Sequence, residues 1–121
     1  MSRQVLPETQ LHPAIQQKVA NLHADIVEEV RQAAADNDVL VIGMWLNPHV
    51  KRARKALEAK GQPYRYLEYG GYHSMWRRRN ALKMWTGWPT FPMVFVKGSL
   101  IGGANEVERL LSSGEFAALL D

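Results

Sequence analysis

The spacing of apolar residues predicts helical structure in the first part of the chain. Between residues 13 and 35 the apolar positions recur every three or four residues, at Ile15, Val19, Leu22, Ile26 and Val30. This interval keeps them on one face of an α-helix. A second possibility stays open, because Asp25 followed by Glu28 is typical of a helix start and would divide the stretch near His23. Residues 1–12 show no such pattern and are expected to form an irregular arm.

The middle of the chain has the pattern of a strand, a helix and a second strand. Residues 39–42 form a short run rich in β-branched side chains that ends at Gly43, which is typical of a buried strand. Asn47-Pro48 is a good helix start, and the predicted helix ends at Gly61. Residues 63–68 alternate in polarity and form the second predicted strand. Because one helix joins the two strands within about 30 residues, they are expected to lie parallel.

The remaining elements complete an α/β pattern. A helix is predicted over residues 73–85, between two breaks that contain glycine. Residues 93–97 and 99–101 flank Gly98 and are expected to form a hairpin. The last predicted helix covers residues 106–111. This order of elements favours a small mixed sheet with helices on both faces.

The chain has 121 residues, of which 46% are hydrophobic, so it can form one domain with its own core. It contains no cysteine, which excludes disulfides, thiolate catalysis, cysteine zinc sites and cysteine-held iron–sulfur clusters. The four histidines lack the spacing of a metal site and are interpreted as scattered surface residues. No run approaches the ~18 apolar residues of a membrane span, and no signal-peptide pattern is visible. We therefore expect a cytoplasmic protein.

The net charge of +3 hides an uneven distribution along the chain. Residues 39–97 carry eleven lysines and arginines against two acids, whereas residues 1–38 and 98–121 each carry a net charge of −3. The basic segment could bind a small anion, an acidic protein or nucleic acid, or it could be a solvated face balanced by the acidic ends. Nucleic acid is disfavoured, because the aromatic residues do not interleave with a basic strand surface and no known binding motif is present.

Three separated motifs resemble those of one protein family. They are Asn47-Pro48-His49-Val50 at a helix start, Trp88-Pro89-Thr90-Phe91-Pro92 before a strand, and Gly98-Ser99-Leu100-Ile101-Gly102-Gly103 at the hairpin. In this order and spacing they look like a glutaredoxin of the thioredoxin superfamily. The resemblance implies a thioredoxin-like α/β fold, a four-stranded mixed sheet flanked by helices, with an extra N-terminal helix. We expect an arm and helical extension, residues 1–38, to pack on a glutaredoxin-like domain, residues 39–121.

The first motif departs from the family at its reactive position. A dithiol glutaredoxin has Cys-Pro-Tyr-Cys where this chain has Asn47-Pro48-His49-Val50. The family reaction needs a thiolate nucleophile, and the amide of Asn47 cannot replace it. Thiol–disulfide oxidoreductase activity is therefore expected to be absent, and so is an iron–sulfur cluster held by that cysteine. Asn47 is still expected to cap the helix that follows it.

The resemblance also implies a groove for glutathione. In the family the proline matching Pro92 is cis and turns the backbone of the preceding residue, here Phe91, toward the ligand; a rigid strand entry is the alternative. The pair Gly102-Gly103 can present backbone N–H groups to a carboxylate. Trp88 is expected in the core or in the wall of the groove. The candidate ligand-binding residues are Asn47, Phe91, Pro92, Gly102, Gly103, Asn105 and Arg79.

Two substitutions weaken the expected groove. Met44 stands where the family usually has a lysine that pairs with a carboxylate of the ligand, and a methionine carries no charge. Ala104 cannot offer the side-chain contact that the family often makes near this position. Arg79 and Lys83 remain candidates for the carboxylate.

Three functions stay open. The first is a redox-inactive protein with a residual groove for glutathione or a similar small carboxylate. The second is a non-catalytic interaction module, in which the N-terminal helix serves self-association and a basic face docks an acidic protein through Lys51, Arg52, Arg54 and Arg79. The third is an enzyme with reassigned chemistry that uses His49, which is disfavoured because the sequence offers His49 no obvious partner. No metal is expected, and glutathione is the one candidate cofactor.

Overall fold

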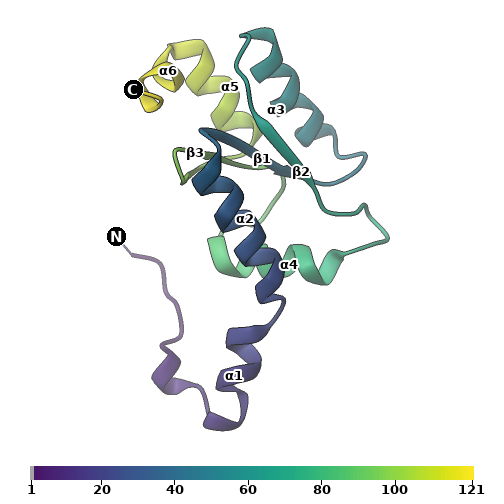
Figure 1. The fold of residues 1–121 in the computed structure, drawn as a ribbon, viewed down its shortest axis with the longest axis vertical. Helices are drawn as coiled ribbons and strands as arrows, with labels where there is room; N and C mark the ends of the chain where they lie inside the picture. The colour runs from purple at the N-terminus through teal and green to yellow at the C-terminus, as the bar shows by residue number, and fades with distance from the viewer. Residues whose placement is uncertain (1) are drawn as a thin grey trace.

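The computed structural model describes residues 2–121 and shows helices on both faces of one sheet (Figure 1). The chain begins with a short 3-10 helix, Glu8–Gln10, and then forms the elements α1 Pro13–Asn21, α2 Ala24–Asp36, β1 Val39–Gly43, α3 Pro48–Ala59, β2 Arg65–Glu68, α4 Trp76–Thr86, β3 Met93–Val96, β4 Ser99–Gly102, α5 Ala104–Ser113 and α6 Glu115–Leu119. None of the described helices is long and apolar enough to cross a membrane.

The sheet has four strands in the order β2-β1-β3-β4. Strand β1 pairs in parallel with β2 and antiparallel with β3, and β3 and β4 form the predicted hairpin. The expected strand–helix–strand unit and the mixed sheet are therefore confirmed. All five residues of β1 are buried, because β1 lies inside the sheet and helices cover both of its faces.

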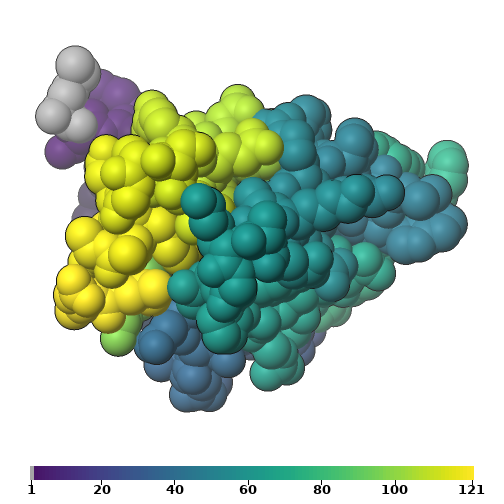
Figure 2. Space-filling view, turned by 90° about the horizontal axis from the view of Figure 1, so that it is seen from above, coloured from purple at the N-terminus to yellow at the C-terminus, as the bar shows by residue number. Residues whose placement is uncertain are grey.

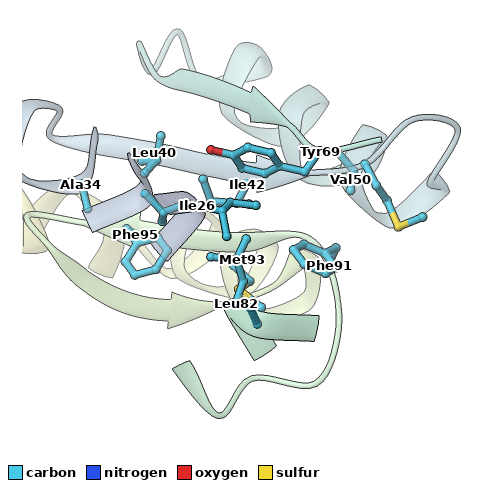
Figure 3. Close-up of a cluster of buried hydrophobic side chains, with 13 residues drawn as sticks. Ile26, Ala34, Leu40, Ile42, Val50, Tyr69, Leu82, Phe91, Met93 and Phe95 are labelled. Atoms are coloured by element: carbon cyan, nitrogen blue, oxygen red, sulfur yellow. The ribbon is translucent and has the colours of Figure 1, made fainter. Parts of the chain in front are cut away.

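Alternate residues of β1 face two different hydrophobic clusters. Leu40 and Ile42 pack in the cluster that contains residues of α2 and α4, and Figure 3 shows them beside Ile26, Leu82 and Met93. The residues between them face the other side, where α3, α5 and α6 cover the sheet, as the view from above in Figure 2 shows for α5 and α6. Both helix layers are thus attached to the same central strand.

The first helical stretch is divided into two helices near His23. His23 has a φ of 45°, in the left-handed region, so the chain turns between α1 and α2. Helix α2 buries Ile26, Val30 and Ala34 in the core, whereas α1 has no buried residue and extends away from the sheet (Figure 1). Of the two alternatives in the sequence, the structure has the divided one. The division of the chain at residue 38 remains a prediction.

Two other element boundaries differ from the sequence prediction. Helix α4 begins at Trp76 rather than residue 73, because Met75 has a φ of 57° and cannot continue a right-handed helix. Helix α5 begins at Ala104 rather than residue 106, and α6 was not predicted at all. Helix α6 follows Gly114, has five residues and buries only Phe116, so its sequence has no apolar repeat from which it could be recognised.

The different environments of α1 and α2 predict unequal effects of the same substitution. Ile26→Ala removes a fully buried side chain and is expected to lower the free energy of unfolding by about 2–5 kcal/mol. Ile15→Ala makes the same chemical change where 41% of the side chain is exposed, and is expected to cost less than about 0.5 kcal/mol. Urea unfolding of both variants measures the difference. Equal losses would contradict the packing described here.

Candidate functional site

The start of α3 is held by the side chain of Asn47. Its Oδ1 accepts hydrogen bonds from the backbone N–H groups of His49 at 2.9 Å and Val50 at 3.2 Å. Pro48 is the first helical residue, where a missing N–H costs no intrahelical bond. The predicted N-cap is therefore confirmed. Residue 47 lies at the N-terminal end of α3, where a thiolate would be stabilised if it were present.

The three sequence motifs meet at one cavity of about 330 Å³. His49 and Arg52 line it from the first turns of α3, and Asn105 lines it from the start of α5. Phe91 and Pro92 line it from the loop before β3, and the peptide bond between them is cis. We call this space the α3–α5 cavity. Gly102 lies next to Gly103 in the chain but does not line the cavity. Asn47 lies two residues before His49 and lines a second cavity, described below, instead.

Arg52 organises the polar side of the α3–α5 cavity. Its Nε lies 3.1 Å from both carboxylate oxygens of Glu108, and its terminal nitrogens bond His49 Nδ1 at 3.1 Å and the side-chain oxygen of Asn105. Because a guanidinium can only donate, Nδ1 of His49 must accept and the ring proton lies on Nε2. Glu108 offsets the charge of Arg52. The sequence showed no obvious partner for His49. In the structure its partner is the guanidinium of Arg52, three residues further along α3.

The glycine pair before α5 is partly occupied by the chain itself. The backbone N–H of Gly103 donates to Oε1 of Glu106 at 2.8 Å. Gly102 has a φ of 124°, and a Cβ there would lie 2.6 Å from Cγ of Glu106. Glycine is therefore required at residue 102 for the Glu106 side chain to fold back over the helix start. One of the N–H groups expected for a ligand carboxylate is already bound to an internal carboxylate.

Trp88 lies both in the core and in the wall of the α3–α5 cavity, the two places expected for it from the sequence. Its ring packs against the core cluster and also lines the α3–α5 cavity. Its Nε1 is buried and has no hydrogen-bond partner among residues 2–121. A Cβ on Gly103 would lie 3.6 Å from that nitrogen, so the indole N–H lies close to the start of α5. An unpaired buried donor is unfavourable unless something accepts from it.

Arg79 is placed outside the cavity. Only 6% of its surface is exposed, and its guanidinium donates to the carbonyl oxygens of Tyr69 at 2.9 Å and Ser74 at 2.6 Å. Burial lowers the pKa of Arg79 from its ordinary value. The residue therefore holds the loop between β2 and α4, and the structure does not bring it to the other candidate residues. Met44 is buried and supplies no charge in its place.

A second cavity, of about 520 Å³, lies on the other side of α3. Trp45 lines it from the loop before α3, Lys51, Arg54 and Lys55 line it from the helix, and Tyr66 lines it from β2. We call it the α3–β2 cavity. The sequence analysis did not find it. The signal that was available is the spacing of the three cations at i, i+3 and i+4, which places them on one side of a helix.

The basic face expected around α3 is therefore divided among three places. Arg52 lies in the α3–α5 cavity, Lys51 and Arg54 lie in the α3–β2 cavity, and Arg79 lies in neither. Consecutive positions on a helix point in different directions, so residues adjacent in the sequence reach different sides.

Comparison with known proteins finds relatives of this chain. The family model named Glutaredoxin matches residues 48–101. The chain is 46% identical over 96 residues to a glutaredoxin-like protein of Dictyostelium discoideum, covering 79% of this chain and 78% of the relative. It is 32% identical over 95 residues to Glutaredoxin-C8 of rice, Oryza sativa subsp. japonica, covering 76% of this chain and 69% of the relative.

Two solved structures share the fold. Oxidized glutaredoxin 2 from Chlamydomonas reinhardtii superposes with a TM-score of 0.69 at 27% identity, over 81% of this chain and 92% of the other. A buckwheat glutaredoxin–glutathione complex superposes with a TM-score of 0.70 at 23% identity, over 83% of this chain and 91% of the other. At that identity the second likeness concerns the fold alone.

The cap geometry predicts how substitutions of Asn47 affect stability. Asn47→Ala removes the acceptor for two backbone N–H groups and is expected to lower the free energy of unfolding by about 1 kcal/mol. Asn47→Asp keeps an acceptor at the same place and is expected to stay near the parent value at neutral pH. Thermal or urea unfolding measures both. Equal stability of all three proteins would show that the cap contributes nothing.

Proposed function

The chain belongs to the glutaredoxin family, and from that premise we propose that it binds glutathione or a similar small carboxylate in the α3–α5 cavity without reacting with it. The protein acts as a non-redox member of the family. The observation that carries the proposal is the meeting of the three motifs at one cavity that contains an unpaired buried indole N–H.

The absence of reaction follows from the atoms present. A mixed disulfide with glutathione needs a sulfur on the protein, and the chain contains no cysteine. The side chain at residue 47 is an amide whose oxygen already accepts two hydrogen bonds. A thiol-containing ligand that reaches from the α3–α5 cavity to the start of α3 would therefore meet a polar but unreactive group.

Binding is supported by the donors around the cavity. Arg52 can donate to a carboxylate after releasing the side chain of Asn105, while Glu108 keeps the guanidinium in place. The Trp88 N–H, which is buried beside the start of α5 without a partner, becomes a second donor when the ligand displaces the atoms that cover it. The solved buckwheat glutaredoxin–glutathione complex, which shares the fold, supports glutathione as the first ligand to test.

The same contacts predict weak affinity. Glu106 already accepts from the N–H of Gly103, and the positions occupied by Met44 and Arg79 present no free cation to a second carboxylate. A ligand with two carboxylates would be held firmly at one end only.

The interaction module is less well supported in the form expected from the sequence. That proposal needs Lys51, Arg52, Arg54 and Arg79 on one face, and the structure distributes them over two cavities and a buried loop contact. An acidic protein could still approach part of this surface, but not the complete set.

Calorimetry with reduced and oxidised glutathione at low salt tests the proposal. Trp88→Phe removes the indole N–H and keeps an aromatic ring, so affinity is expected to fall roughly 2- to 10-fold. Trp85→Phe is the matched control, because Trp85 faces the space between α2 and α4. No heat of binding with the parent protein at millimolar ligand would refute the proposal.

Asn47→Cys tests whether the site lacks only its nucleophile. The new thiol would lie at the N-terminus of α3, which is expected to lower its pKa below the ordinary value of about 8.5. We expect faster alkylation at neutral pH than for a free thiol, and measurable glutathione-dependent reductase activity. A cysteine of ordinary reactivity with no reductase activity would show that Met44 and Ala104 have removed the binding site as well.

A further inference from the structure

We propose that the α3–β2 cavity is a second site, which binds a phosphate-bearing ligand with a flat ring, of the class of nucleoside di- and triphosphates. It lies on the opposite side of α3 from the α3–α5 cavity, so it does not depend on the function proposed above. Its volume of about 520 Å³ is within the range of small-molecule sites.

Arg54 is held in place by two tyrosines. Its Nε donates to the hydroxyl of Tyr64 at 3.0 Å, and its guanidinium carbon lies 3.8 Å from the centre of the Tyr66 ring. Its two terminal nitrogens have no hydrogen-bond or ion-pair partner within residues 2–121. A guanidinium that is fixed at Nε and stacked on a ring presents the planar pair of donors that binds phosphate oxygens.

The backbone makes room for this arrangement at Gly43. A Cβ on Gly43 would lie 2.9 Å from the ring and hydroxyl of Tyr66 and 2.6 Å from Val50. Because Gly43 has no side chain, the ring of Tyr66 can lie over the end of β1, where Arg54 stacks on it.

Two acids, Glu58 and Glu68, also line this cavity, and each is held by a tyrosine hydroxyl while it keeps its negative charge. Glu58 accepts the hydroxyl of Tyr64 at 2.6 Å, and Glu68 accepts the hydroxyl of Tyr66 at 2.9 Å. Burial raises the pKa of both tyrosine hydroxyls, and the hydrogen bonds to the glutamates raise it further. Neither glutamate forms an ion pair within the described chain.

Lys51 and Lys55 add positive charge to the lining and form no ion pair within the described chain. They are four residues apart on α3, where two like charges repel each other. Neither lysine has a carboxylate within 4.0 Å in residues 2–121. With Arg54 they form a group of three cations on one wall of the cavity, against the two carboxylates of Glu58 and Glu68 in its lining, so a bound phosphate meets an excess of positive charge.

Trp45 supplies an aromatic surface at the same cavity. Trp45 is 59% exposed, yet its position is held, because its backbone N–H donates to the carbonyl of Gly70 at 2.7 Å and its ring lies against Gly71. The next residue, Leu46, has a φ of 58°, which is unfavourable for a leucine. An exposed indole beside three cations can stack on a flat ring while its phosphates contact the cations.

Three probes separate the parts of this proposal. ADP, adenosine and tripolyphosphate are titrated at low salt without metal ions, with calorimetry and tryptophan fluorescence as readouts. ADP is expected to bind at least tenfold more tightly than adenosine and more tightly than tripolyphosphate. No binding of ADP at several millimolar would overturn the proposal, and equal binding of ADP and tripolyphosphate would overturn its ring component.

Variants locate the site. Arg54→Lys keeps the charge and loses the paired donors, and the double variant Lys51→Ala, Lys55→Ala removes two surface charges; each is expected to weaken ADP at least fivefold. Lys60→Ala is the control, because Lys60 lies at the end of the same helix and outside the cavity. A loss of the same size in the control would show non-specific attraction.

Two further measurements keep this site distinct from the α3–α5 cavity. Trp45→Ala is expected to abolish the fluorescence change on adding ADP, and Arg54→Lys is expected to leave glutathione affinity unchanged. Circular dichroism confirms that each variant is folded. Displacement of ADP by glutathione would assign both ligands to one site and overturn the proposal of a second one.

Discussion

Both cavities depend on how helix α3 begins. Two backbone N–H groups at its start bond to the side chain of Asn47, and the helix then lies across the sheet with Val50 and Leu57 in the core. This fixed start determines which side chains reach each cavity. A helix without its cap would fray at the residues that form both proposed sites. Asn47 therefore keeps the helix start in place, and because the chain contains no cysteine it offers no thiol there.

Part of the charge of the chain is paired between its segments. Three of the bases in residues 39–97 form ion pairs with acids from the two acidic ends, in the pairs Arg52–Glu108, Arg78–Asp25 and Lys97–Asp38. Arg78 also holds the pKa of the Asp25 carboxyl below its ordinary value. The balance between a basic middle and acidic ends is thus partly internal. Lys51, Arg54 and Lys55, which line the α3–β2 cavity, form no such ion pair within residues 2–121 and can therefore interact with a ligand.

Much of the fold could be predicted because it depends on local patterns. The buried run before Gly43, the cap at Asn47 and the hairpin around Gly98 each follow from residues close together in the chain. Arg79 shows where such reasoning fails. The family resemblance placed it in the groove, but two carbonyl oxygens of the loop before its helix accept hydrogen bonds from its guanidinium. Nothing in the local sequence indicates that a charged side chain will be used to hold a loop.

The sequence by itself determined the class of fold, the cap on α3 and the loss of thiol chemistry, since each depends on which residues are present and on their local spacing. Only the tertiary structure decided which cations share a site. Side-chain direction on α3 sends Arg52 toward Glu108 and Arg54 toward Tyr66, although the two arginines are two residues apart. The neighbours that complete each cavity come from distant segments, so their identity depends on packing and not on local pattern.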